Sequence, residues 1–259
     1  MAVYEFDGEK YRQASRHQKE WGNNLISQLH LKGTEIVLDL GCGDGVLSEQ
    51  IAKLVPKGKV VGIDASCGML QTAKKLECDN LSFIQMDIND MNFSNEFDII
   101  FSNVALHWVL DHSLLLIRSF CALKQGGSIH WNFAGDGTCA AFYDVMRMKM
   151  QEKQYAPYFE GFIWPWFMPS KAQYKGLIDS VGFSKVEIIE ENKDRYFSNA
   201  DEMIRWIDQP SIVPFIERVP DEKKESFRKE VIQLMVEKTE QKDGRCFETF
   251  RRINVTAVK

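Results

Sequence analysis

A glycine-rich turn and a later aspartate are the residues whose types and spacing best suit ligand chemistry. The apolar run at residues 35–40 leads into the pentapeptide GCGDG at 41–45, and residues 46–54 then have a helical pattern. Glycine lets a backbone turn tightly and approach a ligand, and the helix start supplies N–H groups. Asp64 stands nineteen positions after Gly45, at the expected end of the next strand, where a carboxylate can accept both ribose hydroxyls. Together, the turn and the carboxylate predict an adenosyl ligand.

Two adenosyl cofactors fit this arrangement, and the details of the turn favour one of them. A dinucleotide turn has the spacing G-x-G-x-x-G, whereas residues 39–45 read DLGCGDG, and Asp44 brings negative charge to where a pyrophosphate would lie. S-adenosylmethionine (SAM) has no phosphate and carries a cationic amine, which Asp39 could hold directly or through water. The sequence therefore predicts SAM, and an NAD-dependent Rossmann oxidoreductase stays open as an alternative.

The elements expected to position this site alternate as strands and helices, which is typical of a parallel sheet covered by helices. An amphipathic helix at residues 11–31 is followed by strands at 35–40, 60–64, 81–86, 97–103 and 128–133. After a break, the pattern continues with a helix at 171–181, a strand at 184–190, a helical stretch at 199–242 and a strand at 247–257. We expect one α/β domain (1–259) with a core at about 1–135, 170–195 and 245–259, and cap insertions at about 136–169 and 196–244.

Composition and charge narrow the function classes. The 259 residues are 44% hydrophobic and 27% charged, which suits an ordinary globular chain. The net charge of −5 comes from charges scattered along the chain, which disfavours a nucleic-acid partner. No apolar run is long enough to span a bilayer and residues 1–10 lack a signal pattern, which predicts a cytoplasmic protein without a membrane partner. The six cysteines have no short paired spacing, so no metal site and no disulfide framework are expected.

Several motifs occur in the order found in class I SAM-dependent methyltransferases (methyltransferase type 11/12 domains), which the sequence resembles. They are DLGCGDG at 39–45, GID at 62–64 with Ser66 and Met69, Asp87, and LKQGG at 123–127. Three further segments resemble the trans-aconitate methyltransferase group, with biotin-pathway malonyl-carrier methyltransferases as cousins: SNVALHWVLDH at 102–112, ADEMIRW at 200–206 and FRRINVTAV at 250–258. The resemblance is dense only before residue 135. It implies a Rossmann-like SAM-methyltransferase fold, with a mostly parallel seven-stranded sheet flanked by helices and a helical, aromatic cap.

The same resemblance implies a site for SAM, whose product would be S-adenosylhomocysteine. The residues at its methionine part would be Asp39, Gly41, Cys42, Gly43 and the backbone carbonyl of Asn103, with Tyr11 and Gln18 over the carboxylate. Those at the ribose and adenine would be Asp64, Ala65, Met69, Asp87 and Ile88. Ordinary roles as caps, core or surface residues remain the alternative for Asp39, Asp87, Met69, Tyr11 and Gln18.

The acceptor decides whether catalysis needs a base. A carboxylate is already ionised at neutral pH and needs only a clamp in a dry pocket, whereas a hydroxyl or amine usually needs a general base. His107 and Trp108 follow the fourth strand, at the edge where open α/β sheets bind substrates. His107 is the candidate base, or a packed histidine, and Trp108 is a candidate pocket wall near the transferring methyl. The other predicted pocket residues are Trp131, Trp164 and Trp166, and the candidate clamps are Arg195, Arg205, Arg251 and Arg252.

We therefore predict an enzyme that methylates a small molecule, by O-methylation of a carboxylate. Three alternatives stay open: methylation at N, O or C of another small molecule with His107 as base, the NAD-dependent oxidoreductase, and a SAM-binding partner protein without catalysis. The expected assembly is a monomer or a weak homodimer. Its expected partner is the small-molecule acceptor.

Overall fold

The computed structural model describes residues 16–259 and divides into two compact units. The first unit comprises the chain up to Asp136 together with Trp166–Glu191 and Arg252–Lys259, and the second comprises Gly137–Pro165 and Asn192–Arg251. The glycine turn, Asp64 and His107 all belong to the first unit. That the whole chain is one domain stays a prediction.

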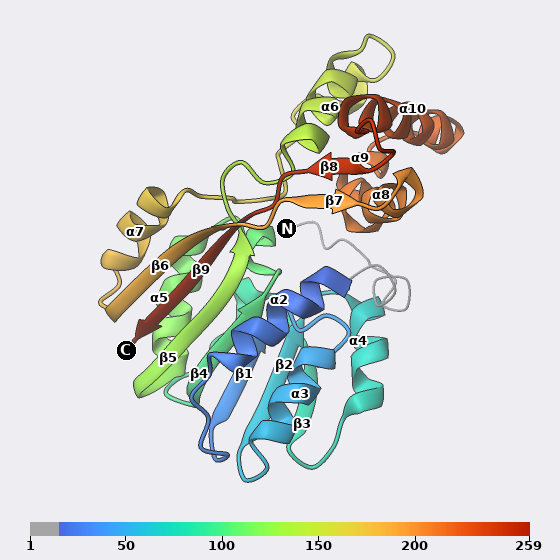
Figure 1. The fold of residues 1–259 in the computed structure, drawn as a ribbon. Coiled ribbons are helices and arrows are strands. Elements are labelled where there is room, and N and C mark those ends of the chain that lie inside the picture. Colours follow the sequence, from blue (N-terminus) through green and yellow to red (C-terminus); the bar gives the residue numbers. More distant parts are fainter. Residues whose placement is uncertain (1–15) are drawn as a thin grey trace. The chain divides into compact units, whose positions relative to one another are not determined.

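A seven-stranded sheet forms the frame of the first unit, with the strand order β3-β2-β1-β4-β5-β9-β6 (Figure 1). Its strands are β1 (Ile36–Leu40), β2 (Lys59–Asp64), β3 (Leu81–Gln85), β4 (Phe97–Asn103), β5 (Leu123–Ala134), β6 (Ser184–Asn192) and β9 (Arg251–Val258). The pairs from β3 to β5 are parallel, and β9 runs antiparallel to β5. The predicted α/β class and the mostly parallel seven-stranded sheet are confirmed.

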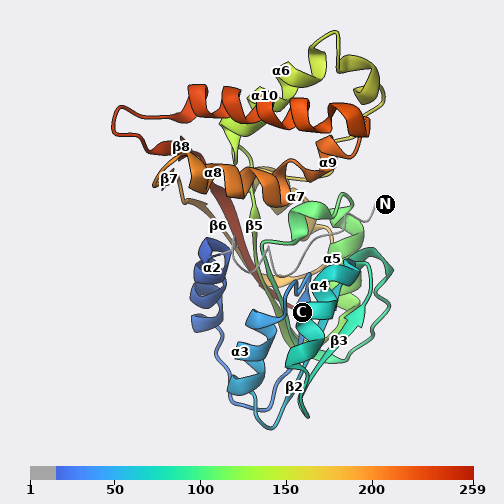
Figure 2. The same ribbon diagram turned by 90° about the vertical axis from the view of Figure 1, so that its right-hand side faces the viewer.

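Helices cover both faces of this sheet. On one face lie α2 (Arg16–Ser27), α3 (Val46–Leu54) and α4 (Cys67–Ala73), and on the other lie α5 (His112–Ala122) and α7 (Lys171–Asp179). Figure 2 shows α2 and α3 together on one side of the strands. Successive side chains of a strand point to opposite faces. Because Leu38 and Leu40 pack on the α5 side, Asp39 between them faces α3.

The strand bounds predicted up to residue 103 agree with the structure to within one residue. The fifth strand begins earlier than predicted, because Leu123 already pairs with Phe97 across a register shift. The prediction of one strand at 247–257 was wrong. Residues Cys246–Glu248 form β8, which pairs with β7 (Arg195–Phe197) in a separate two-stranded sheet, while β9 joins the main sheet. The apolar pattern runs through both strands, and it carries no information on where the pairing partner changes.

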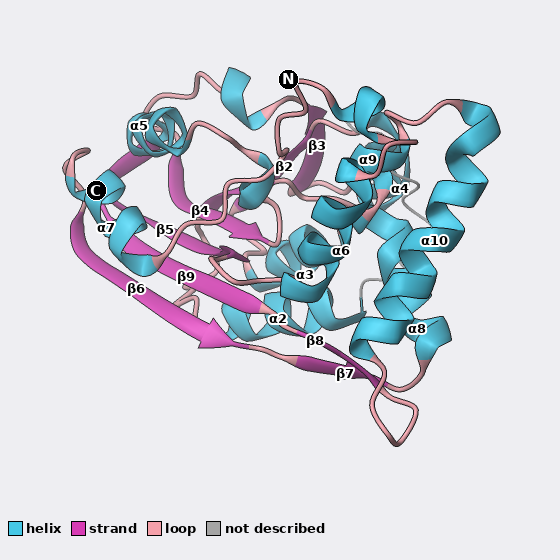
Figure 3. Ribbon diagram, turned by 90° about the horizontal axis from the view of Figure 1, so that it is seen from above, coloured by secondary structure: helices cyan, strands magenta, loops and turns pink. Residues whose placement is uncertain are grey.

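The second unit is helical and aromatic, as predicted for the insertions. Its helices are α6 (Ala140–Gln151), η4 (Ala156–Phe159), α8 (Ala200–Trp206), η5 (Ile207–Ser211), α9 (Val213–Ile216) and α10 (Asp221–Thr239), and Figure 3 shows β7 and β8 side by side. Its core contains the buried rings of Phe142, Phe215 and Phe227. The Phe142 and Phe215 rings lie 6.0 Å apart in an edge-on arrangement that suits aromatic packing.

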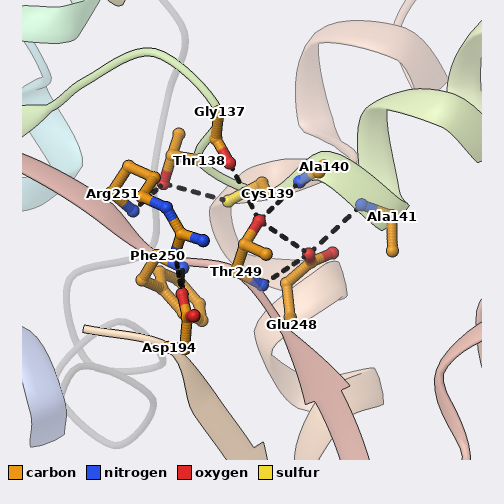
Figure 4. A network of polar contacts seen from close by, with 10 residues as sticks. All are labelled: Gly137, Thr138, Cys139, Ala140, Ala141, Asp194, Glu248, Thr249, Phe250 and Arg251. Atoms are coloured by element: carbon orange, nitrogen blue, oxygen red, sulfur yellow. Dashed lines mark hydrogen bonds and ion pairs between the residues drawn. The ribbon is translucent and has the colours of Figure 1, made fainter. Parts of the chain in front are cut away.

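The start of α6 is held by β8 and the residue after it (Figure 4). The Glu248 carboxylate accepts hydrogen bonds from the N–H of Ala141 at 3.2 Å and of Phe142 at 2.9 Å, and Thr249 Oγ1 accepts one from Ala140 at 3.0 Å. The N-cap residue Cys139 makes no side-chain cap bond and has φ 51°. Two residues distant in sequence therefore satisfy N–H groups that a local cap would usually satisfy.

Candidate cofactor and acceptor site

Gly43 and Gly45, in the turn after β1, are glycines for two different structural reasons. Gly43 and Gly45 have φ of 57° and 78°, in the left-handed region that favours glycine. A Cβ on Gly45 would lie 2.7 Å from Cζ of Phe83 and 2.9 Å from Cβ of Ala73, so the fold requires glycine there. Among the described residues, a Cβ on Gly43 would meet no atom within 4 Å. Within this part of the chain Gly43 therefore borders open space, as expected of backbone that a ligand approaches.

Asp64 at the end of β2 fastens this turn. Its carboxylate accepts hydrogen bonds from the N–H of Gly43 and of Ser66, both at 2.9 Å. Ser66 in turn caps α4 by accepting from the N–H of Met69 at 3.3 Å. The predicted ribose-binding carboxylate therefore also holds the turn and the start of the next helix in place.

Two further carboxylates near the turn have protein partners. Asp39 is buried and accepts a hydrogen bond from Ser48 Oγ at 2.6 Å. Burial, together with the charge of Asp64, raises the pKa of Asp39 to about 7, although the Ser48 bond opposes this shift. Asp44 forms an ion pair with Lys19 of α2 at 3.3 Å. Since Lys19 offsets its charge, Asp44 is a weaker argument against a pyrophosphate than the sequence alone indicates, and the argument from glycine spacing is unaffected.

Of the residues predicted at the ribose and adenine, Ala65 follows β2, Asp87 and Ile88 follow β3, and Met69 lies in α4. Asp87 caps the 3₁₀ turn Ile88–Asp90 by accepting from the N–H of Asn89 at 2.8 Å, so its alternative role as a cap is present. Ile88 and Met69 are buried, and Ala65 is half-buried. Cys42 is also buried, which raises the pKa of its thiol and keeps it protonated. The ligand roles of these residues stay predictions.

Asn103 connects the end of β4 to α2. Its Nδ2 donates to the backbone oxygen of Gln18 at 2.9 Å. Within residues 16–259, Asn103 Oδ1 and Gln18 Oε1 are buried without a hydrogen-bond partner. Val104, the next residue, has φ 59°, a strained conformation for a β-branched residue that is typical of functional sites. Tyr11 lies outside the described residues.

Comparisons with known proteins identify the family. A family model described as a methyltransferase domain matches residues 31–161, just over half of the chain. The chain belongs to this family. It is an SAM-dependent methyltransferase of class I with a Rossmann-like fold.

The chain is also similar to named methyltransferases in sequence and to several solved structures in fold. A trans-aconitate 2-methyltransferase of Mycobacterium tuberculosis is 28% identical, over 97% of this chain and 96% of its own. The protein of the same name from Deinococcus radiodurans is 29% identical over 71% of each chain. The YcgJ protein of Bacillus subtilis has a similar fold, with a TM-score of 0.64 and 17% identity over 93% of this chain and 98% of its own. A phosphoethanolamine N-methyltransferase of Haemonchus contortus, solved with SAM, has a TM-score of 0.60 and 19% identity, over 97% of this chain and 56% of its own.

The observed groups fit SAM. The side-chain oxygens of Asn103 and Gln18, which have no partner among the described residues, are acceptors, and the ammonium of SAM is a donor that buried acceptors require. The Gln18 oxygen therefore suits the ammonium, whereas the resemblance implied the carboxylate for this residue. The open space at Gly43 lies beside the Asp64 carboxylate, which holds the Gly43 N–H. The described part of the chain contains no cluster of three or more His, Cys, Asp or Glu residues that could hold a metal ion. It also contains no helix long and apolar enough to cross a membrane.

His107 and Trp108 lie in the 3₁₀ turn Leu106–Trp108 that follows β4. His107 is buried, and its Nδ1 has no hydrogen-bond partner among the described residues. Burial, and after it the positive charge of Arg252, lowers the pKa of His107 to about 3. The Trp108 ring lies 5.3 Å from that of Trp166. At neutral pH this site therefore has a neutral imidazole beside an indole pair.

The other predicted acceptor residues lie in different elements, and Trp164 lies in the second unit. Trp131 points away from the α2 side of the sheet and is buried in the core with Tyr174. Trp164 belongs to the second unit, where Arg147 stacks on its ring at 5.4 Å. Arg252 is buried in the first unit and lies 4.8 Å from the centre of the Trp21 ring.

The remaining candidate arginines are in the second unit, and two of them have carboxylate partners there. Arg251 pairs with Asp194, and Arg195 pairs with Glu202. Arg205 lies in the last turn of α8. Arg252 is therefore the candidate clamp that shares a unit with the glycine turn.

Sequence reasoning missed two residues of this region. Ser48 holds Asp39, and Asn132 binds Arg252 through its Oδ1. Asn132 is the last of three polar residues of β5, after Ser128 and His130, that alternate with apolar ones, and this pattern does not single it out. Ser48 lies nine positions after Asp39, and no sequence pattern indicates their contact.

Proposed function

We propose that this methyltransferase transfers the methyl group of SAM to a carboxylate oxygen of a small anionic molecule. Two observations support the proposal: a buried cation, which suits an anionic acceptor, and a histidine whose lowered pKa makes it a weak base. Arg252 is 3% exposed, and its charge contributes to the lowered pKa of about 3 at His107. A group with so low a pKa accepts protons poorly at neutral pH, so the site suits an acceptor that is already ionised.

The chemistry needs no proton transfer. When bound, SAM supplies a methyl group on a positively charged sulfur. Its transfer to a carboxylate oxygen would form a bond from carbon to oxygen as the bond from carbon to sulfur breaks, and would give a methyl ester and S-adenosylhomocysteine. The residues of the chain therefore have to bind, orient and dehydrate the two partners.

Each side of the reaction has its own candidate residues. For SAM they are the Gly43 backbone, Asp64, and the oxygens of Gln18 and Asn103. For the acceptor they are the Arg252 guanidinium and the indoles of Trp108 and Trp166, whose apolar surface excludes water. The names of the relatives make trans-aconitate the first acceptor to test.

The test is a screen of carboxylic acids, amines and phenols, scored by release of S-adenosylhomocysteine and by product mass. We expect products only from acids, and we expect them to lose the methyl group in alkali, as esters do. For the best acid, the rate should be flat between about pH 6 and 8, because a carboxylic acid with a pKa near 4 is ionised throughout. A rate that falls below about pH 6.5 in the wild type but not in His107→Ala, with unchanged SAM binding, would contradict the proposal.

A further inference from the structure

A chain of hydrogen bonds crosses the last three strands of the main sheet. Nε and Nη2 of Arg252 donate to Asn132 Oδ1 at 3.0 and 2.6 Å. Asn132 Nδ2 donates to Asn254 Oδ1 at 2.6 Å. Asn254 Nδ2 donates to Glu191 Oε2 at 2.8 Å. We call Asn132, Asn254 and Glu191 together the amide relay.

The two ends of the relay fix the direction of every bond in it. A guanidinium can only donate hydrogen bonds, and a carboxylate can only accept them. The two amides between them can therefore satisfy all partners in one orientation alone, with their oxygens toward Arg252 and their NH₂ groups toward Glu191. Such a chain polarises along its length and holds the planar guanidinium at a defined angle.

The relay lies where the acceptor is expected. Arg252 is in register with Ala134 at the end of β5, and Asn132 is in register with Asn103 at the end of β4. These ends belong to the same edge of the sheet as the glycine turn, which is where open α/β folds bind ligands. Arg252, Asn132 and Asn254 occupy alternate positions to the core residues Phe133 and Ile253, so they face the α2 side together with Asn103.

The chemistry of methyl transfer decides which acceptor group such a cation serves best. The carboxylate that is methylated loses its charge, so an ion pair to it weakens as the reaction proceeds. Binding that is stronger before the transition state than in it does not speed the reaction. A carboxylate elsewhere on the acceptor keeps its charge throughout.

We propose that Asn132 is a positioning residue, which aims the Arg252 guanidinium at a carboxylate of the acceptor other than the one that is methylated. The amide relay thereby gives the enzyme a preference for acceptors with two or more carboxylates. This inference rests on the proposed function, which it extends from carboxylates to polycarboxylates.

The sharpest test moves the negative charge along the relay. The double variant Asn132→Asp/Glu191→Gln keeps the net charge and gives every group a partner, because Asn254 can turn over between the new aspartate and the new glutamine. The aspartate then adds an ion pair to Arg252 at the position of the amide oxygen. We expect the dissociation constant and the KM of trans-aconitate to rise about 10- to 100-fold, the scale of one charge-assisted contact, with kcat little changed. Calorimetry on the full chain loaded with S-adenosylhomocysteine gives the first value, and initial rates give the other two.

Three comparisons separate positioning from a general loss of structure. Glu191→Gln alone leaves an acceptor for Asn254, so it should cost less affinity than the double variant. Arg252→Lys keeps the charge but lacks the planar fork that Asn132 aims, and it should also raise KM. A monocarboxylic acid should have the same KM in the double variant and the wild type. Asn24→Asp on exposed α2 makes the same substitution away from the relay and should change none of these values.

The outcomes distinguish this inference from the proposed function. Ester formation from acids with the same trans-aconitate constants in wild type, the double variant and Arg252→Lys would overturn the relay alone. An equal rise in KM for monocarboxylic and polycarboxylic acids would do so as well. Products from amines or phenols only, with no calorimetric binding of trans-aconitate, would overturn both.

Discussion

Gly43→Ala separates ligand binding from folding. The added methyl group meets no atom of the described residues within 4 Å, so the expected cost to the fold is that of a left-handed alanine at φ 57°. The left-handed conformation costs an alanine about 1–2 kcal/mol. Alanine loses less chain entropy on folding than glycine does, which returns about 0.5–1 kcal/mol, so the net cost is about 1 kcal/mol. For a chain of this size we expect the melting temperature to fall by about 2–4 °C. The methyl group would occupy the space assigned to SAM, so S-adenosylhomocysteine should bind at least about 10-fold more weakly by calorimetry.

Gly45→Ala is the matched control on the same turn. Its methyl group would lie within 3 Å of both Phe83 and Ala73, so overpacking adds about 1–3 kcal/mol to the same backbone cost. The variant should therefore melt well below Gly43→Ala. If Gly43→Ala bound S-adenosylhomocysteine with the wild-type dissociation constant, SAM would not lie against this glycine, and the cofactor site would have to be placed elsewhere.

Two further predictions concern carboxylates and histidines. Asp64→Ala should weaken SAM binding by about 1.5–3 kcal/mol, and it should also lower the melting temperature because two backbone N–H bonds are lost, whereas exposed Asp79→Ala should do neither. Burial lowers the pKa to about 3 in His107 and to about 4 in His112 and His130, so between pH 6.5 and 4 the unfolded chain binds more protons than the folded one. The free energy of unfolding should therefore fall as the pH drops below about 6.5, by up to about 1.4 kcal/mol per pH unit for each histidine. Above pH 6.5 these histidines should leave it unchanged. Asp39, whose pKa is raised to about 7, opposes part of this fall, because between about pH 7 and 4 it binds its proton more tightly in the folded chain. Urea titrations at pH 7.5, 6 and 5 measure the net fall, and equal stabilities at the three values would count against buried neutral histidines.

The part of the fold that follows from local sequence was predicted well. The first four strands are short apolar runs bounded by turn residues, and such runs carry their own boundaries. The strand pairing of the last third depends on distant partners. Cys246–Glu248 and Arg251–Val258 look like one strand because both are apolar and alternate, yet they pair with β7 and β5 in different sheets. Pairing is a tertiary property that periodicity does not encode.

In the candidate site, too, the part with a local sequence motif was predicted and the part that depends on tertiary structure was not. The turn and Asp64 were found because a motif of fixed spacing has a fixed backbone geometry, and the structure brings the Gly43 N–H to that carboxylate. The acceptor side has no such motif. Trp164 and Trp166 are two positions apart in sequence and belong to different compact units, so their proximity along the chain predicted nothing about a shared pocket.

Strand register explains why the role proposed for Asn132 becomes visible only in the folded sheet. In the sequence, Asn132 continues the polar positions of Ser128 and His130, which alternate with apolar residues, and nothing distinguishes it from those two. Register places it between Asn103 at the end of β4 and Asn254 on β9, on the face that the aromatic rings of its two sequence neighbours avoid. A buried amide is costly unless its oxygen and both its N–H groups find partners, and neighbouring strands can supply such partners at matching heights. This row of side chains across the strands begins with Asn103, which is predicted to meet the methyl donor. It leads to Arg252, which is proposed to hold the acceptor. One register across three strands would therefore set the spacing between the two substrates, so the spacing depends on the rigid sheet and not on the loops around it.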